Sequence, residues 1–135
     1  MNINSKTSTK VTVVVIVLFA ATAFMQQGAW KAPASADQKK NTVPSNEQTL
    51  AAGKILYNKE CASCHGKKGK GDGPAAIALS KPAGDLSSVQ AQAQSDGAHF
   101  WKITEGKAPM PTFKKKFTEE QVWQIVNYIR TFTKK

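Results

Sequence analysis

The sequence has 135 residues, of which 41% are hydrophobic, and a formal net charge of +10. This length and apolar content are those of one small globular domain with additional segments. The excess of basic residues predicts a partner with an acidic surface, and the chain shows no RNA-binding or helix-turn-helix pattern, so we expect no nucleic-acid partner.

The N-terminal part of the chain has the pattern of a targeting segment. Residues 1–10 contain two lysines and no acidic residue, and residues 11–25 are almost entirely apolar. A basic region followed by such an apolar region is typical of a signal peptide. A spanning helix needs about 20 apolar residues, and this run reaches that length only by including two glutamines before Trp30. We therefore predict that residues 1–30 are either a signal peptide or an N-terminal membrane anchor.

Residues 31–45 contain two prolines and many small or polar residues, which is typical of a linker. We predict that this linker has no core of its own and that the folded domain comprises residues 46–135. Two triplets of small residues, Ala34 to Ala36 and Ala21 to Ala23, are candidate cleavage sites. Whether residues 1–30 are cleaved as a signal peptide or retained as an anchor, the rest of the chain is expected to be exported.

A helix is expected at residues 47–60, because apolar residues recur there at helical spacing. Ser45 is its expected N-cap, with Gln48 completing a capping box. Gly53 is unusual inside a helix, where glycine costs about 1 kcal/mol relative to alanine. Together with Tyr57 one turn later, this glycine favours a point where another helix crosses closely, and simple tolerance of one glycine is the alternative.

The next five residues, Cys61-Ala62-Ser63-Cys64-His65, have the pattern of a c-type haem attachment site. Two thiols at this spacing form thioethers to the two vinyl groups of one haem, and the imidazole of His65 then ligates the iron. The chain has no other cysteine. The motif therefore predicts one covalently bound haem c.

Two other roles for these cysteines are disfavoured. A redox-active Cys-x-x-Cys pair is typical of a βαβ setting, and the sequence contains no pair of strand patterns. A structural zinc ion needs four ligands. The only cysteines and histidines are those of the motif and His99, and the adjacent Cys64 and His65 would be strained as joint ligands.

The rest of the chain predicts helices and loops only. The glycine-rich run 66–74 predicts a tight loop, and residues 75–80 a short helix. Ser95 or Asp96 is expected to cap a helix that ends at Glu105. A capping box at residues 118–121 precedes a last helix whose apolar residues repeat at intervals of three and four. The predicted fold class is all-α.

Met110 is the expected second axial ligand, because the other methionines, Met1 and Met25, fall in the targeting segment. A methionine is more often a core filler. Met110 instead lies between two prolines in an expected extended loop, residues 107–111, which favours ligation. His99 is the competing ligand, although an ordinary surface or edge histidine is its default role. Histidine with a methionine thioether is an axial pair that raises the reduction potential of haem iron.

From residue 47 onward the sequence resembles the class I monohaem c-type cytochromes, which are similar to haem-c subunits of bacterial respiratory chains. The resemblance rests on the attachment motif, the Gly71–Pro74 run after it and the Gly106–Pro111 loop. It implies the cytochrome c fold, with three to five short helices around one covalently bound haem.

The resemblance also implies two contacts. The first helix is expected to meet the last one at Gly53 and Tyr57, close to Ile125 and Tyr128. The backbone carbonyl of Pro74, or of a neighbour, is expected to orient the ring of His65.

These features predict an electron carrier and not an enzyme, because two axial ligands close both sides of the iron. The alternative is a haem enzyme or gas sensor with an open sixth coordination position, which requires that Met110 does not ligate. Because covalent haem attachment occurs outside the cytoplasm in bacteria, the domain is expected in the periplasm or on the outer face of the cytoplasmic membrane.

Lysines cluster on both sides of the expected haem crevice, at residues 67–70 and 114–116. They predict a docking surface for a redox protein with an acidic face, such as an oxidase, a reductase or a dehydrogenase. An ordinary solvated surface is the alternative for such lysines. Whether the protein diffuses freely or is a fixed subunit of a membrane complex stays open.

Overall fold

The computed structural model describes residues 30–133. In this range the chain forms helices, loops and one isolated β-bridge, without strands, which confirms the all-α class. The predicted signal peptide or membrane anchor lies outside the described residues, apart from Trp30. Among the residues that are described, no helix is long and apolar enough to cross a membrane.

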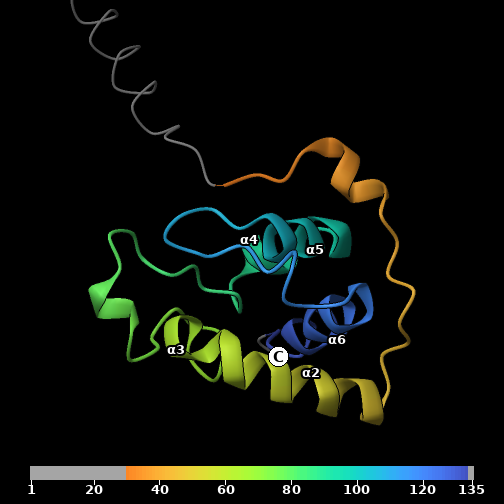
Figure 1. The fold of residues 1–135 in the computed structure, drawn as a ribbon, viewed down its shortest axis with the longest axis horizontal. Coiled ribbons are helices and arrows are strands. Elements are labelled where there is room, and N and C mark those ends of the chain that lie inside the picture. Colours follow the sequence, from red (N-terminus) through yellow and green to blue (C-terminus); the bar gives the residue numbers. More distant parts are fainter. Residues whose placement is uncertain (1–29, 134–135) are drawn as a thin grey trace, which may run out of the picture. The chain divides into compact units, whose positions relative to one another are not determined.

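The described helices include two short 3-10 helices, here called η2 and η3, besides the α-helices labelled in Figure 1. In chain order they are η2 (Ala34–Gln38), α2 (Glu47–Glu60), α3 (Ala62–His65), η3 (Ala76–Ala78), α4 (Val89–Gln92), α5 (Asp96–Glu105) and α6 (Glu119–Arg130). The three long helices lie where the sequence predicts them. The helix expected at residues 75–80 is only the single turn η3, and the sequence pattern does not predict α4.

The capping residues explain where the long helices begin. Thr118 and Gln121 form the predicted capping box of α6, and Ser95 caps α5. The cap predicted for α2 is wrong by one residue, because Asn46 and not Ser45 is the N-cap. The Thr49 N–H donates to Asn46 Oδ1 (3.0 Å) and the Asn46 N–H donates to Thr49 Oγ1 (3.1 Å), so this pair forms the box.

The first long helix, α2, packs on the last, α6, at Gly53. A Cβ atom on this buried glycine would lie 2.0 Å from the carbonyl oxygen of Gln124 and 3.1 Å from Cβ of Tyr128. One turn later Tyr57 is fully buried, with its ring centroid 5.4 Å from that of Tyr128. The predicted close crossing is therefore confirmed, and Ile125, also fully buried, belongs to the same core.

The core continues from this crossing to the attachment motif. Cys61 and Ala62 are buried members of the same cluster as Trp123 and Val126, which have no exposed surface. The attachment motif is thus packed in the same core as the α2–α6 pair.

Residues 34–43, here called the strap, pack on the domain and do not form the predicted linker. The compact unit begins at Ala32. Ala36 is buried, and its carbonyl oxygen would lie 1.9 Å from a Cβ on Gly97 of α5, so only glycine permits this approach. The Ser95 hydroxyl, which caps α5, donates to Asp37 of the strap.

The strap is also fastened to α6. Asn127 is 94% buried, with 6% of its surface exposed. Its Oδ1 accepts from Nδ2 of Asn41 (2.7 Å), and its Nδ2 donates to the carbonyl of Val43 (3.1 Å). Lys39 pairs with Glu119 (2.8 Å) and lies 4.6 Å from the centroid of the Phe100 ring. Because a buried amide needs such partners, the strap completes the core. The candidate cleavage triplet at Ala34 to Ala36 lies within this packed segment.

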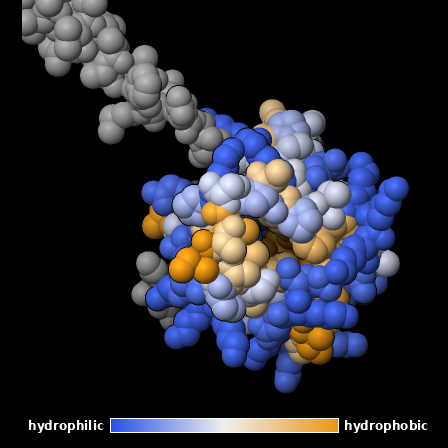
Figure 2. Space-filling model, turned by 60° about the vertical axis from the view of Figure 1, so that its left-hand side comes forward, coloured by the Kyte–Doolittle hydropathy of each residue, from blue (hydrophilic) through white to orange (hydrophobic). Residues whose placement is uncertain are grey.

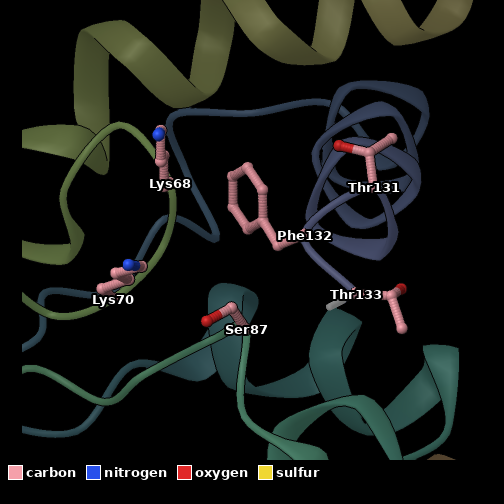
Figure 3. Close-up of a pocket in the computed structure, with 6 residues that line it drawn as sticks. All are labelled: Lys68, Lys70, Ser87, Thr131, Phe132 and Thr133. Atoms are coloured by element: carbon pink, nitrogen blue, oxygen red, sulfur yellow. The ribbon is translucent and has the colours of Figure 1, made fainter. Parts of the chain in front are cut away.

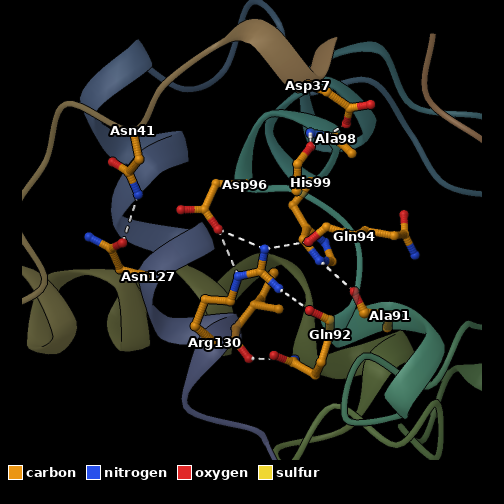
Figure 4. Close-up of polar contacts among 12 residues, drawn as sticks. Asp37, Asn41, Ala91, Gln92, Gln94, Asp96, Ala98, His99, Asn127 and Arg130 are labelled. Carbon is orange, nitrogen blue, oxygen red and sulfur yellow. Dashed lines mark hydrogen bonds and ion pairs between the residues drawn. The ribbon is translucent and has the colours of Figure 1, made fainter. Parts of the chain in front are cut away.

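Arg130, at the end of α6, joins α4 and α5 to the core (Figure 4). Its Nε donates to Asp96 at 2.7 Å, and its two terminal nitrogens donate to the carbonyls of Gln92 (2.8 Å) and Gln94 (2.6 Å). The side chain of Gln92 returns a bond to the carbonyl of Ile129 (3.1 Å). This network fixes the short helix α4 although its own sequence pattern is weak.

Candidate haem-attachment site

The motif forms a single helical turn that follows α2 directly. Cys61 is the N-cap of α3, and its N–H donates to the carbonyl of Tyr57 (2.8 Å). The N–H of His65 donates to the carbonyl of Cys61 (2.8 Å). Both cysteines are free thiols, with Cys61 buried and Cys64 partly exposed. Burial raises the pKa of Cys61 to about 12.

The glycine-rich loop after the motif closes back over α3. Gly71 donates to the carbonyl of His65 (2.8 Å), Gly73 to that of Cys64 (3.1 Å) and Ala75 to that of Ser63 (2.8 Å). These bonds satisfy carbonyls that a short helix would otherwise leave unpaired. A Cβ on Gly73 would lie 2.2 Å from the carbonyl oxygen of Ser63, which explains the glycine at this position.

The carbonyl that orients His65 belongs to Gly84 and not to Pro74. The Nδ1 atom of His65 lies 3.0 Å from the oxygen of Gly84. The expectation for Pro74 is therefore wrong, because the Gly71–Pro74 run turns back onto α3 and a later segment reaches the ring. Sequence reasoning missed Gly84, since a backbone carbonyl leaves no residue-type signature.

The bond to Gly84 prepares the other ring nitrogen of His65 for a metal. A neutral imidazole that donates from Nδ1 keeps its lone pair on Nε2, which is the arrangement typical of metal-ligating histidines. Burial lowers the pKa of His65, and the hydrogen bond to Gly84 opposes this shift. Because burial is the larger effect, the pKa is lowered overall, and the neutral form that a metal needs is favoured.

Met110 lies in a tight turn and not in the predicted extended loop. The N–H groups of Lys107 and Met110 each donate to the other's carbonyl, at 3.0 and 2.9 Å. Gly106 has φ of 67° and returns the chain so closely that a Cβ would lie 2.5 Å from Pro111. The Met110 side chain is half-buried and packs against the core.

His99, the competing ligand, is a buried structural residue and not a surface or edge histidine. It is 4% exposed, and its Nε2 lies 2.9 Å from the carbonyl of Ala91 in α4. Burial, together with the nearby charge of Arg130, lowers its pKa to about 4. Its ring therefore serves the packing of α5 against α4.

The residues of this site fit a covalently attached haem. Two free thiols lie on one helical turn, and a neighbouring imidazole is fixed through Nδ1. Figure 2 shows a hollow in one face of the domain, and the residues around it are coloured as hydrophobic. Within the described residues, no group of three or more His, Cys, Asp or Glu side chains is arranged to hold a metal ion, as a zinc site would require.

Comparison with known proteins finds relatives over most of the domain. Residues 48–129 match the family model described as cytochrome c oxidase, cbb3-type, subunit III. Cytochrome c6 of Rippkaea orientalis is 35% identical over 93 residues, which cover 65% of this chain and 75% of the relative.

Two solved structures share the fold. The c-type cytochrome KustC0563 has a TM-score of 0.54 and 32% identity, over 61% of this chain and 98% of its own. A chain of the reducing HAO-like protein complex Kustc0457/Kustc0458 of Kuenenia stuttgartiensis has a TM-score of 0.62 and 27% identity. That match covers 68% of this chain and 47% of the other, so the present chain spans about half the length of that one.

Proposed function

Because the chain belongs to the cbb3-type subunit III family of monohaem c-type cytochromes, whose members transfer electrons through haem, we propose that it carries single electrons between proteins of a respiratory chain. Cys61 and Cys64 bind the haem covalently, and His65 and Met110 are its axial ligands. The haem supplies the one-electron redox chemistry. The protein holds the ligands in place, so that little rearranges when the oxidation state changes.

One observation carries this proposal: the ring of His65 is fixed through Nδ1 by the carbonyl of Gly84. A ligand that is already oriented by the backbone suits an electron carrier, because the protein then reorganises little between oxidation states. Residues 1–30 are proposed to export the domain to the periplasm or to the outer face of the cytoplasmic membrane. Haem staining of membrane and soluble fractions distinguishes a retained anchor from a cleaved signal peptide.

A Met110→Ala variant tests the axial pair. We expect it to keep its covalent haem, because the attachment residues are unchanged, and to have a lower reduction potential. The expected decrease is roughly 0.1–0.3 V, a part of the range of about 0.8 V that axial ligands span. Potentiometric titration measures it, and the weak thioether charge-transfer band of the oxidised protein should vanish.

Lys107→Ala is the matched control, because both hydrogen bonds between Lys107 and Met110 join backbone atoms, which this change keeps. Its potential should stay close to that of the wild type. An unchanged potential and band in Met110→Ala would refute methionine ligation. If the wild type also binds carbon monoxide readily, the sixth position is open and the protein is an enzyme or a gas sensor.

The two lysine clusters differ in their surroundings. Lys114 pairs with Glu105 at 3.1 Å, and Lys116 pairs with Glu60. No ion pair is formed within the described residues by the three lysines of the first cluster, Lys67, Lys68 and Lys70. We propose that the first cluster contributes more of the positive potential that attracts an acidic redox partner.

Ferricyanide, an anionic oxidant, measures this difference. We expect replacement of Lys67, Lys68 and Lys70 by Gln to slow oxidation of the reduced protein several-fold at low ionic strength, because steering by charge is lost. Replacement of Lys114, Lys115 and Lys116 by Gln removes the same number of charges and should slow it less. Stopped-flow measurements of the oxidation rate over a range of salt concentrations test this difference. Equal slowing by the two triple variants would contradict the proposal, and so would a wild-type rate that does not change with salt.

A further inference from the structure

A small cavity lies between the glycine-rich loop and the end of α6, and no residue of the attachment motif lines it (Figure 3). Its volume is about 270 Å³. The ring of Phe132 lies between the loop that carries the two lysines and the end of α6, and no carboxylate is among the lining residues. The residues around it are Lys68, Lys70, Ser87, Thr131, Phe132 and Thr133.

The backbone fixes both lysines at the wall of this cavity. Gly69, between them, has φ of 73°, and a Cβ there would lie 2.5 Å from the Phe132 ring. Its carbonyl accepts from the N–H of Leu86 (2.6 Å), and its own N–H donates to the carbonyl of Gly66 (3.1 Å). Lys68 and Lys70 therefore extend from a loop segment that is already held against Phe132.

The hydroxyl groups of the cavity are already committed as donors. Thr131 donates to the carbonyl of Tyr128 (2.7 Å), and Thr133 donates to that of Arg130 (2.7 Å). Ser87 donates to Oδ1 of Asp85 (2.6 Å). Among the side-chain donors that line the cavity, the two ammonium groups are consequently the ones that remain for a ligand.

The last turn of α6 does not need these lysines. Its carbonyls at Tyr128, Ile129 and Arg130 all accept hydrogen bonds from Thr131, Phe132, Thr133 or Gln92. Within the described residues, neither Lys68 nor Lys70 forms an ion pair or a hydrogen bond. Helix capping and internal charge pairing therefore do not account for two lysines at one small cavity.

We propose that the cavity binds one anionic group, a phosphate or a carboxylate, between the ammonium groups of Lys68 and Lys70. Lysine ammonium groups bind phosphate as point charges. The volume lies just below the range of about 300–1,000 Å³ that is usual for sites of drug-sized ligands. It is large enough for a small oxyanion, or for the carboxylate of a single side chain presented by another protein. The site contains none of the proposed haem ligands, but it uses Lys68 and Lys70 of the first lysine cluster. Its occupation by a protein carboxylate therefore rests on the proposed docking of an acidic partner, whereas its occupation by a free oxyanion does not.

Nuclear magnetic resonance of the reduced, ¹⁵N-labelled holoprotein tests the site. One arm uses sodium phosphate and the other the peptide Ac-Gly-Glu-Gly-NH₂, both with sodium chloride holding the ionic strength constant. We expect saturable shifts of the Gly69 and Phe132 amide signals. Saturation with phosphate alone assigns the site to a free oxyanion, and saturation with the peptide assigns it to a protein carboxylate.

A double variant, Lys68→Gln with Lys70→Gln, should weaken the binding about tenfold or more, because each charge-assisted contact is lost. Lys54→Gln with Lys59→Gln removes the same charge from exposed positions of α2 and should leave the affinity unchanged. Absence of saturation in both arms, or equal weakening in the two double variants, would overturn the proposal.

Discussion

A Gly53→Val variant is expected to lose roughly 3 kcal/mol or more of its free energy of unfolding, at or above the upper part of the range for overpacked cores. The added Cβ would lie 2.0 Å from the carbonyl oxygen and 2.6 Å from the carbonyl carbon of Gln124. Both are backbone atoms of α6, so no side-chain rotation relieves the overlap. The two helices must separate.

The effect should reach the haem site. Tyr57, one turn after Gly53, packs against Tyr128 and Phe132, with ring centroids 5.4 and 5.1 Å away. Its hydroxyl donates to the carbonyl of Gly66 at 2.8 Å, directly after the attachment motif. Displacement of α2 therefore moves the residues that position His65, and a smaller yield of haem-loaded protein should accompany the loss of stability.

Denaturant titration and thermal unfolding of the purified holoprotein measure this change. For a domain of this size we expect the melting temperature to fall by more than about 10 °C. Ala51→Val is the matched control, because it introduces the same β-branched residue at an exposed position of α2. A Gly53→Val protein as stable as this control would show that the crossing tolerates a side chain.

Acidification is expected to destabilise the protein by about 3 kcal/mol through His99 alone. Its folded-state pKa is about 4, against an ordinary value of 6.5, because the ring is buried and lies near the charge of Arg130. Between these two values the unfolded chain binds a proton that the folded chain does not bind. The stabilising contribution is therefore complete above pH 6.5 and is lost as the pH falls toward 4.

A His99→Gln variant isolates this contribution. The glutamine amide can donate to the carbonyl of Ala91, as Nε2 of His99 does in the wild type, and it does not titrate. Urea unfolding of both holoproteins at several values between pH 7 and pH 4 gives two stability curves. The wild-type curve should fall more steeply, and parallel curves would show that His99 does not carry the proton-linked loss.

The sequence indicated the local features of the site, because these depend on neighbouring residues. Cys61, Cys64 and His65 are recognisable by their spacing alone, and the capping box at Thr118 with the repeat that follows it predicts α6. Gly53 stands out because a glycine inside a helix needs a reason. The resemblance to c-type cytochromes then connected the two helices, and the structure confirms that contact.

The features that sequence reasoning missed are contacts between residues far apart in the chain. The carbonyl of Gly84, 19 residues after His65, orients its ring, and any residue type offers such a carbonyl. The strap looks like a linker because its partners, among them Gly97 and Asn127, lie in helices near the other end of the sequence.

The sequence by itself therefore predicted the cofactor and its attachment residues and determined the helical class, since each depends on short-range residue patterns. Only the tertiary structure decided which carbonyl fixes His65, whether residues 34–43 belong to the domain, and which lysines carry unpaired charge. These properties depend on which atoms meet when the chain packs. That packing depends on the burial and the shapes of side chains over the whole domain, and a local residue pattern does not contain this information.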